Sequence, residues 1–421
     1  MRTSPRSIVR RLSRVLLCVV AAVPAAVVVD AAAAKPAGPT PCAWRFMSDG
    51  DVLDVAFPDE NATYWVLPYA LGANDSIEVS GTYPSARYFS LNTYGTDLDT
   101  TDTLRDDQIL PDSGSGNPFA DPAAQVLPPE QRRRHATLVT GPADHERNEI
   151  RALRDGGPPV GFLIIRVYVP DDPASPSGGV PLPQFAYRLG GTTTPVQPCA
   201  QPFDPRTLPA PVADAGQWVV DRAIERAASG AFRADTPEAT FVNPASTSGL
   251  FPNGDNKYIG AVLTYQPGRV AVVRGRAPVF PDTRAGASPT EPGQQVRYWS
   301  MCQNDLVSPY PVVACAADFQ TDRGADGRYT YVVAAPGDVP SNVDPTVTVL
   351  PWGSTDVPKK LLILRNMLPT AAFYPTSIQA SQADGTDPAA TMGAYYPEVT
   401  YCSTATVEMR GYAGCFEGDR R

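Results

Sequence analysis

Lysine and histidine are scarce in this sequence. The chain has four lysines (Lys35, Lys257, Lys359 and Lys360) and two histidines (His135 and His145). It contains no His-Glu-x-x-His, Gly-x-Ser-x-Gly or Cys-x-x-Cys sequence. These absences argue against a zinc hydrolase, against a serine hydrolase with a nucleophile elbow, and against a dithiol or zinc site. We expect neither a cofactor nor a metal ion.

Positive charge is in the minority. The 35 lysines and arginines face 44 aspartates and glutamates, which gives a formal net charge of −9. Loss of residues 1–34, which hold five arginines and one aspartate, would make it −13. An acidic surface of this size repels a phosphate backbone, so nucleic acid is not an expected partner.

Long apolar runs are also missing beyond the N-terminus, where residues 1–34 have the pattern of a secretory signal peptide. An arginine-rich start precedes an apolar run at 15–29 and a stretch of small residues. Pro24 interrupts the run, which is shorter than the roughly 20 residues that a spanning helix needs, so an uncleaved anchor is the weaker alternative. Arg10-Arg11 leaves the general and twin-arginine routes open. We expect a secreted or cell-envelope protein with no transmembrane segment after signal cleavage.

Six cysteines follow the signal segment. An even number of cysteines in an exported chain indicates disulfides, although six cysteines allow 15 pairings. The internal repeat described next narrows the choice, because two cysteines bracket its first copy and four lie in its second. The predicted pairs are Cys42 with Cys199, Cys302 with Cys315, and Cys402 with Cys415.

A tandem duplication organises the chain. Phe57, Tyr64, Val79, Gly81 and Pro84 recur 194 positions later as Phe251, Tyr258, Val273, Gly275 and Pro278. The tetrad Arg87-Tyr88-Phe89-Ser90 recurs as Arg297-Tyr298-Trp299-Ser300, offset by 210, so the second copy carries sixteen extra residues before its tetrad. We therefore expect two lobes of common origin.

The 46 prolines and 33 glycines favour short strands joined by turns over long helices. Alternating or continuous apolar patterns predict strands at 64–71, 76–81, 86–94 and 161–170. We expect a mainly β protein with two antiparallel β-sandwich lobes, at 42–200 and 250–421. A proline-rich linker at 201–249 would hold one helix, at 217–228.

Three further segments carry expectations. The polar stretch 96–129 predicts a long loop, which is usually functional or disordered. A short helix is expected around 143–154. The tail that ends with Cys402 and Cys415 is expected to be a stapled hairpin.

Arg166 and Arg365 are equivalent arginines in apolar strands. A buried guanidinium needs a carboxylate partner, and the candidates are aspartates of the same copy: Asp97, Asp106 or Asp107 in the first, Asp305 or Asp318 in the second. One interpretation is a structural clamp, the other a ligand-facing role. Repeated residues serve shared architecture before shared chemistry, which favours the clamp.

The repeated tetrads pose the same choice. Arg87 and Phe89 share one strand face, as do Arg297 and Trp299, so each pair can stack as cation on ring or line a groove for an anionic or sugar ligand. The candidate ligand-binding residues are therefore Arg87, Phe89, Arg166, Asp106, Asp107, Arg297, Trp299 and Arg365.

The sequence gives less support to a catalytic site or a metal site. Ser90 and Ser300 have no candidate base, because neither histidine recurs in the second copy. The oxygen-rich turns at 59–61 and 253–256 lack the spacing of an EF-hand, and Asx-turn chemistry accounts for them without calcium. A carboxylate pair of the glycosidase kind stays open, because 44 acidic residues offer no way to choose two.

The stretch 83–94, Tyr-Pro-Ser-Ala-Arg-Tyr-Phe-Ser-Leu-Asn-Thr-Tyr, is followed by Asn-Pro-Phe at 117–119 and by Ile-Arg-Val-Tyr-Val-Pro at 165–170. These motifs resemble the domain of unknown function family numbered 1214, in a tandem, exported, actinobacterial-like form. The resemblance covers most of 50–190 and, more weakly, 250–370, where Met301-Cys302-Gln303 and Asn366 depart from the pattern. It implies a jelly-roll-like β-sandwich in proteins that are often exported, and it implies no activity.

Our leading hypothesis is an exported, non-catalytic binding or cell-envelope-associated protein for carbohydrate or another surface ligand. The alternative is a hydrolase outside the cytoplasm that uses carboxylates at 96–121. A third hypothesis is a structural secreted protein with no small ligand. The sequence leaves the oligomeric state open.

Overall fold

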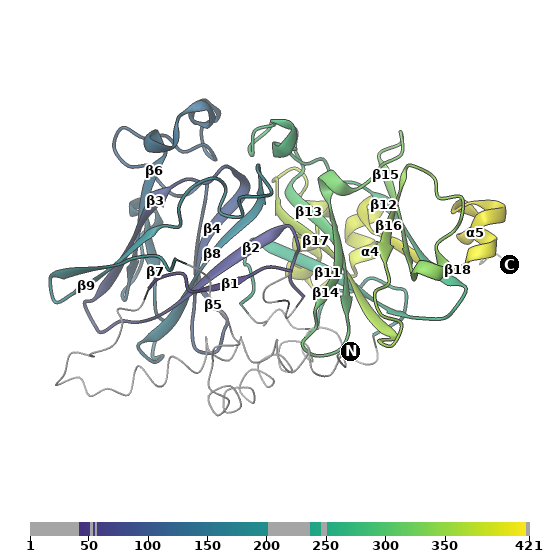
Figure 1. The fold of residues 1–421 in the computed structure, drawn as a ribbon, viewed down its shortest axis with the longest axis horizontal. Coiled ribbons are helices and arrows are strands. Elements are labelled where there is room, and N and C mark those ends of the chain that lie inside the picture. Colours follow the sequence, from purple (N-terminus) through teal and green to yellow (C-terminus); the bar gives the residue numbers. More distant parts are fainter. Residues whose placement is uncertain (1–41, 51–53, 55–56, 201–235, 246–250, 418–421) are drawn as a thin grey trace.

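The computed structural model describes residues 42–50, 54, 57–200, 236–245 and 251–417. The predicted signal peptide, the predicted helix at 217–228 and most of the linker lie outside these residues. Four sheets in two pairs form two lobes side by side (Figure 1). Each lobe is a β-sandwich, which confirms the expected fold class.

The first lobe packs two five-stranded sheets together. In spatial order, one contains β1 (Phe46–Ser48), β2 (Ala62–Ala70), β8 (Val160–Pro170), β4 (Ala86–Tyr94) and β5 (Thr100–Arg105). The other contains β10 (Thr192–Val196), β9 (Gln184–Leu189), β3 (Ser76–Thr82), β6 (Arg133–Val139) and β7 (Glu149–Arg151). The four strands predicted from apolar patterns correspond to β2, β3, β4 and β8.

The second lobe has two four-stranded sheets. One contains β11 (Asn256–Thr264), β17 (Lys359–Pro369), β13 (Val296–Asp305) and β14 (Val312–Ala317). The other contains β16 (Val347–Pro351), β15 (Arg328–Ala334), β12 (Arg269–Arg276) and β18 (Glu398–Ser403).

Apart from the edge strands β1 and β10, each strand of the first lobe has an equivalent in the second. The order β2-β8-β4-β5 corresponds to β11-β17-β13-β14, and β9-β3-β6-β7 to β18-β12-β15-β16. The register matches as well, because Ser90 lies opposite Arg166 and Ser300 opposite Arg365. A parallel pair of strands occurs at the equivalent place in each lobe, β6 with β7 in the first and β15 with β16 in the second. The duplication seen in the sequence is thus present in the topology.

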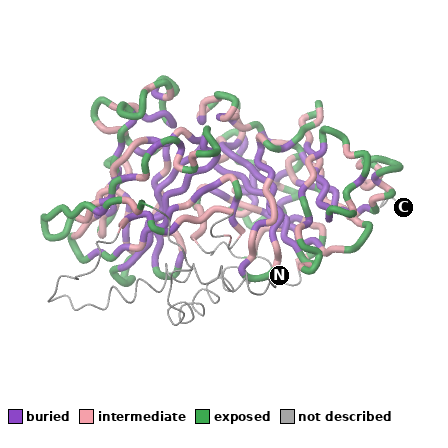
Figure 2. Tube along the Cα trace, in the orientation of Figure 1, coloured by how far each residue is buried: buried purple, intermediate pink, exposed green. Residues whose placement is uncertain are grey.

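Apolar side chains between the sheets form the core of each lobe. In β4, Phe89 and Leu91 pack with Ile77 and Val79 of the facing sheet. Every residue of β4 is buried, and the equivalent strand β13 is buried over all but its last residue. A strand that is buried on both faces must also be covered by other residues on the face that points away from its own sandwich core. Figure 2 shows buried segments within both lobes and where the lobes meet.

Two helices distinguish the second lobe. The segment between β17 and β18 holds α3 (Ile378–Asp384) and α4 (Pro388–Met392), whereas the shorter segment 171–183 joins the equivalent strands of the first lobe. Side chains start both helices: the Ser377 hydroxyl accepts from the N–H of Ala380, and Asp387 accepts from Ala389. Among the described residues, no helix is long and apolar enough to cross a membrane.

All three predicted disulfides are present: Cys42–Cys199, Cys302–Cys315 and Cys402–Cys415. The first closes the N-terminal edge of the first lobe, the second joins β13 to β14, and the third holds the C-terminal helix. Three disulfides in one chain indicate an oxidising environment outside the cytoplasm.

Two local predictions are wrong. The helix expected around 143–154 is a single 3-10 turn, His145–Arg147, followed by β7; Asn148 adopts φ 57°, and the buried Ile150 pairs with Leu138. The tail is no hairpin, because the Ser403 hydroxyl caps a helix, α5 (Thr404–Arg410), directly after β18.

The long loop expected at 96–129 contains β5 and two 3-10 turns, Pro122–Val126 and Pro129–Gln131. The other 3-10 turns among the described residues are Thr283–Ala285, Asp318–Gln320, Pro336–Asp338, Tyr374–Thr376, Gly393–Tyr395 and Ala413–Cys415.

Candidate functional site

The two lobes meet through the sheets that contain β4 and β13. Tyr88 and Tyr168 of the first lobe form one apolar cluster with Tyr298 and Met367 of the second. The rings of Tyr168 and Tyr298 lie edge to face, with their centroids 5.5 Å apart. This contact covers the outer faces of both central strands and makes the boundary between the lobes a buried interface.

The tetrad arginines exchange partners across this interface. Arg87 pairs with Asp318 of the second lobe, and both side chains are fully buried. Arg297 pairs with Asp106 of the first lobe, with 3.3 Å between Nη1 and Oδ2. Each aspartate also accepts the backbone N–H of its own lobe's tetrad strand, Asp106 from Phe89 and Asp318 from Trp299. The contact is reciprocal, as in an isologous dimer interface.

The tetrad tyrosines also bind aspartates of the opposite lobe. The Tyr88 hydroxyl donates to Asp255 of the second lobe over 2.8 Å. The Tyr298 hydroxyl donates to Asp59 of the first lobe over 2.9 Å. The oxygen-rich turns discussed above as calcium candidates therefore act as acceptors for the opposite lobe.

The partners expected for Arg166 and Arg365 were wrong. Arg166 donates to the Phe251 carbonyl over 2.5 Å, and Arg365 donates to the Phe57 carbonyl over 2.6 Å. These carbonyls belong to equivalent phenylalanines with φ of 54° and 60°, a left-handed conformation that aims the carbonyl at the other lobe's arginine. Tyr64 and Tyr94 contact Arg166 instead of an aspartate.

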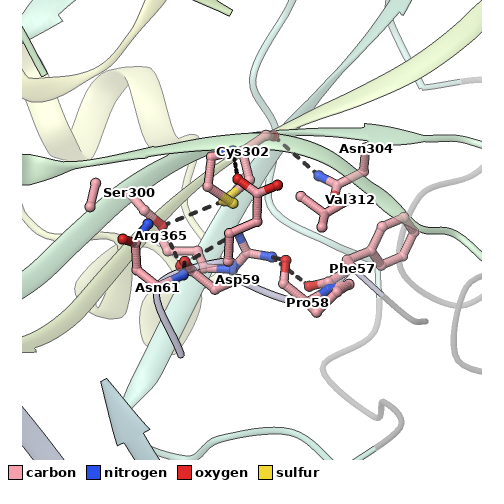
Figure 3. The surroundings of a disulfide bond; sticks show 12 residues. Phe57, Pro58, Asp59, Asn61, Ser300, Cys302, Asn304, Val312 and Arg365 are labelled. Atoms are coloured by element: carbon pink, nitrogen blue, oxygen red, sulfur yellow. Dashed lines mark hydrogen bonds and ion pairs between the residues drawn. A yellow bond between two sulfur atoms is a disulfide. The ribbon is translucent and has the colours of Figure 1, made fainter. Parts of the chain in front are cut away.

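Figure 3 shows the Arg365 end of this arrangement. Asp59 lies beside the Cys302–Cys315 disulfide, and its carboxylate accepts from the Ser300 hydroxyl over 2.7 Å. Asp59 and the two sulfurs lie close enough together for a metal site, but the sulfurs are bonded to each other and offer no thiolate ligand. The geometry is that of a clamp between β13 and the first lobe.

Burial of the exchanged carboxylates changes their acidity. Burial raises the pKa of Asp106 to about 7, although the guanidinium of Arg297 lowers it. Burial likewise raises the pKa of Asp318 to about 6 against the opposing effect of Arg87. A raised carboxyl pKa means that the folded state holds its proton at a pH where the unfolded chain has lost it.

This difference predicts the direction of the pH dependence. Stability contributed by protonated Asp106 is complete below the unfolded pKa near 4 and is lost as pH rises through about 7. We expect the free energy of unfolding to fall by about 2 kcal/mol between pH 5 and pH 8. Urea denaturation across this range measures the slope, and Asp106→Asn should reduce it, while Asp318 continues to contribute in the same direction. An unfolding free energy that rises over the same range would contradict the assignment.

The two aromatic candidates are buried. Phe89 and Trp299 belong to the two lobe cores, and the stacking expected with their neighbouring arginines is absent: Arg134 stacks over Phe89 at 4.2 Å. Arg87 instead lies between the rings of Phe280 and Phe319 of the second lobe. Burial of Arg87, Arg166, Arg297 and Arg365 favours the clamp interpretation.

The acidic loop residues are engaged in local contacts. Asp107 pairs with Arg105 at the surface, Asp112 binds His135, and Asp121 caps a 3-10 turn. Asp102 holds His145 and the backbone N–H of Arg151. These contacts account for both histidines as partners of structural aspartates.

A cavity of about 310 Å³ opens at one end of the interface. We call it the inter-lobe cavity. The first lobe contributes Asp99, Thr100 and Arg154, and the second contributes 252–254, 256–258 and Gln382. The lobes are joined at its rim by the hydroxyls of Tyr94 and Thr100, which donate to the Pro252 carbonyl over 3.0 and 2.9 Å.

Amide groups around this cavity lack partners among the described residues. The unpaired atoms are Nδ2 of Asn253, Oδ1 of Asn256 and Oε1 of Gln382. Asn256 is 8% exposed, so its unpaired oxygen carries a desolvation cost of about 1–3 kcal/mol. One donor and two acceptors without partners therefore belong to residues that line a space large enough for a small molecule.

Charged and aromatic groups complete the cavity. Burial lowers the pKa of Lys257, while Asp255 raises it. Tyr258 adds an aromatic ring, and its backbone carbonyl accepts from Nε2 of Gln382 over 2.7 Å, which fixes α3 against β11. Pairing amides with a ring, an ammonium and a carboxylate is typical of sites for small polar ligands.

None of these lining residues was among the candidate ligand-binding residues, although Asp99 lies in the stretch 96–121 whose carboxylates the hydrolase hypothesis uses. Asn253 and Asn256 were noticed only as turn residues, and Gln382 was not considered. One feature of the sequence indicates this site. The two copies differ in length, and α3 lies in the segment between β17 and β18, which is longer than its equivalent in the first copy.

Comparisons with known proteins identify the fold. No protein-family model and no curated protein matches the chain. A crystal structure of an uncharacterized protein from Burkholderia cenocepacia superposes with a TM-score of 0.55 at 14% identity, over 96% of this chain and 91% of that one. A protein from Vibrio parahaemolyticus gives a TM-score of 0.38 at 13% identity, over 82% and 90%. The chain thus shares its overall two-lobed architecture with the uncharacterized Burkholderia protein.

Proposed function

We propose that this chain is an exported, non-catalytic binding protein of the cell envelope, and that a carbohydrate binds in the inter-lobe cavity. The disulfides and the signal-like N-terminus support export. We also retain the proposed relation to the domain of unknown function family numbered 1214, which rests on the tetrad and late-strand motifs.

One observation carries the proposal. Three residues that line one cavity, Asn253, Asn256 and Gln382, carry amide groups with a donor or an acceptor that has no partner among the described residues. A sugar hydroxyl is donor and acceptor at once, so adjacent hydroxyls satisfy this mixed set better than an anion or a cation would. Tyr258 provides the apolar face on which a pyranose ring rests.

The chain offers a matched pair of variants. Gln382 and Gln379 lie on one turn of α3, and each donates Nε2 to a backbone carbonyl of the sheet, over 2.7 and 2.8 Å. Only Gln382 lines the cavity. Methionine at either position removes the same kind of hydrogen bond, so the two variants should lose similar stability.

We expect Gln382→Met to weaken sugar binding about 5- to 10-fold, which corresponds to one lost hydrogen bond of about 1 kcal/mol or slightly more. Gln379→Met should leave affinity unchanged. Isothermal calorimetry with a panel of mono- and disaccharides measures both. Failure of every sugar to bind the unmodified chain, or equal losses in the two variants, would reject the proposal.

A further inference from the structure

A second cavity, of about 350 Å³, lies in the second lobe away from the inter-lobe cavity. We call it the arginine cavity. Arg276 of β12 and Arg323 line it together with Phe280, Asp282, Gln295 and Tyr395. Part of its wall comes from two segments that the second copy has in excess: Phe280, Asp282 and Gln295 from the stretch before the tetrad, and Tyr395 from the segment between β17 and β18.

The two arginines are free of carboxylates in the part of the chain that the structure describes. The guanidinium of Arg323 lies 5.1 Å from the centroid of Phe280, and that of Arg276 lies 6.0 Å from the centroid of Tyr395. Stacking on a ring orients a guanidinium and leaves the N–H groups at its edge available. The nearby Arg274 and Arg328 both lie beside Asp326 and serve as a contrast.

Asp282 does not neutralise them. Its Oδ1 lies 3.7 Å from Nη2 of the buried Arg87 and also accepts the backbone N–H of Ala285. Arg87 itself is already paired with Asp318, and the lining of the cavity holds two arginines, Arg276 and Arg323, against one carboxylate, Asp282. The local charge is positive in a protein whose overall charge is −9.

The neutral groups add another donor. Nε2 of Gln295 donates to the Tyr395 hydroxyl over 2.8 Å, while Oε1 of Gln295 accepts from the backbone N–H of Val279. Because the Tyr395 oxygen accepts from Gln295, its own O–H is available to donate elsewhere. The N–H groups of two guanidinium groups and the hydroxyl proton of Tyr395 therefore surround the cavity. These donors can form hydrogen bonds with the oxygens of an oxyanion.

We propose that the arginine cavity binds an oxyanionic group, a carboxylate or a phosphate, held by Arg276 and Arg323 with Tyr395 as a third donor. This site is separate from the inter-lobe cavity and does not depend on the carbohydrate proposal. The segments that the second copy has in excess supply Phe280, Gln295 and Tyr395 to this site.

The test uses the full chain with three probes: inorganic phosphate, citrate and glucuronate. Sodium chloride holds the ionic strength constant, so that general screening does not differ between samples. We expect at least one probe to raise the melting temperature in a saturable way. Phosphate alone would indicate a phosphate monoester ligand, and citrate or glucuronate alone would indicate a carboxylate.

Substitutions of single arginines test whether the probe binds in the arginine cavity. Arg276→Gln and Arg323→Gln should each weaken binding of the active probe at least tenfold, and Arg274→Gln, on the same strand but outside the cavity, should change it less than twofold. All three side chains are on the surface, and circular dichroism checks that each variant is folded. Absence of saturable binding to all three probes, or an equal loss in Arg274→Gln, would overturn the proposal.

Discussion

Arg87→Met is expected to lower the free energy of unfolding by about 3–5 kcal/mol, because it leaves Asp318 as a buried charge without its partner. Both side chains of this pair have 0% relative exposure, so water cannot replace the lost guanidinium. Asp318 cannot turn away either, since it accepts the backbone N–H groups of Trp299 and Phe319. The loss is expected at the contact between the lobes.

Chemical denaturation at pH 8 is the right measurement, because Asp318 has a pKa of about 6 while Arg87 is present, so at pH 8 the variant must either bury the carboxylate without a partner or take up a proton. Arg105→Met is the matched control. Arg105 and Asp107 form a pair that is 28% and 32% exposed, and its loss should cost less than about 1 kcal/mol. A cost for Arg87→Met no greater than that of the control would show that the exchanged pairs do not hold the lobes together.

A second variant separates charge from packing. Arg87→Met combined with Asp318→Asn removes both charges and keeps an acceptor oxygen for one of the two amides, Trp299 or Phe319, which donate to different oxygens of Asp318. If the uncompensated carboxylate causes the loss, the double variant should be more stable than Arg87→Met alone. If lost packing against Phe280 and Phe319 causes it, the double variant should show no recovery.

The fold was predictable because its determinants are local or repeated. Apolar alternation located β2, β3, β4 and β8, and equal offsets in the two copies predicted equivalent lobes. The cysteine pairs followed from their positions relative to the copies. The helix expected at 143–154 failed because Ile150 pairs with Leu138 in the sheet, and that tertiary contact outweighs a weak helical propensity.

The exchange of partners between lobes was not predictable in the same way. Each copy contains both the arginine and the aspartate, at equivalent positions, so spacing is equally compatible with pairing within a lobe or across the interface. Arg166 shows a further limit, since its acceptor is a backbone carbonyl at Phe251 that carries no side-chain signal. Only the packing of the two β4-type strands decides between these arrangements.

Repeated and unrepeated residues have different roles in this chain. The repeated arginines, aspartates and tyrosines are buried in the contact between the lobes, where they serve the shared architecture. Both cavities instead draw on what the second copy has in excess, Gln382 and Tyr395 from one segment and Phe280 from the other. After duplication, insertions in one copy are where new binding surface arises without disturbing the common core.

Loss of the Cys42–Cys199 disulfide is expected to destabilise the protein by about 5 kcal/mol. The bond closes a loop of 157 residues, and the chain-entropy estimate grows with the logarithm of loop length. It also fixes the N-terminal edge of the first lobe, where the N–H of Ala43 donates to the Gln197 carbonyl and the N–H of Cys199 donates to the Ala43 carbonyl. Without the bond, this edge is held by two backbone hydrogen bonds and the side chain of Trp44.

The Cys402–Cys415 disulfide is the internal control, because it closes a loop of 13 residues, for which the same estimate gives about 3 kcal/mol. Double Cys→Ser variants at each pair, compared by denaturation under non-reducing conditions, measure the difference. The entropic account requires the Cys42–Cys199 variant to lose more stability than the Cys402–Cys415 variant. The long loop has the greater conformational freedom to lose in the unfolded chain. A greater loss of stability in the Cys402–Cys415 variant would therefore contradict the entropic account. It would mean that local packing at α5 determines what these bonds contribute.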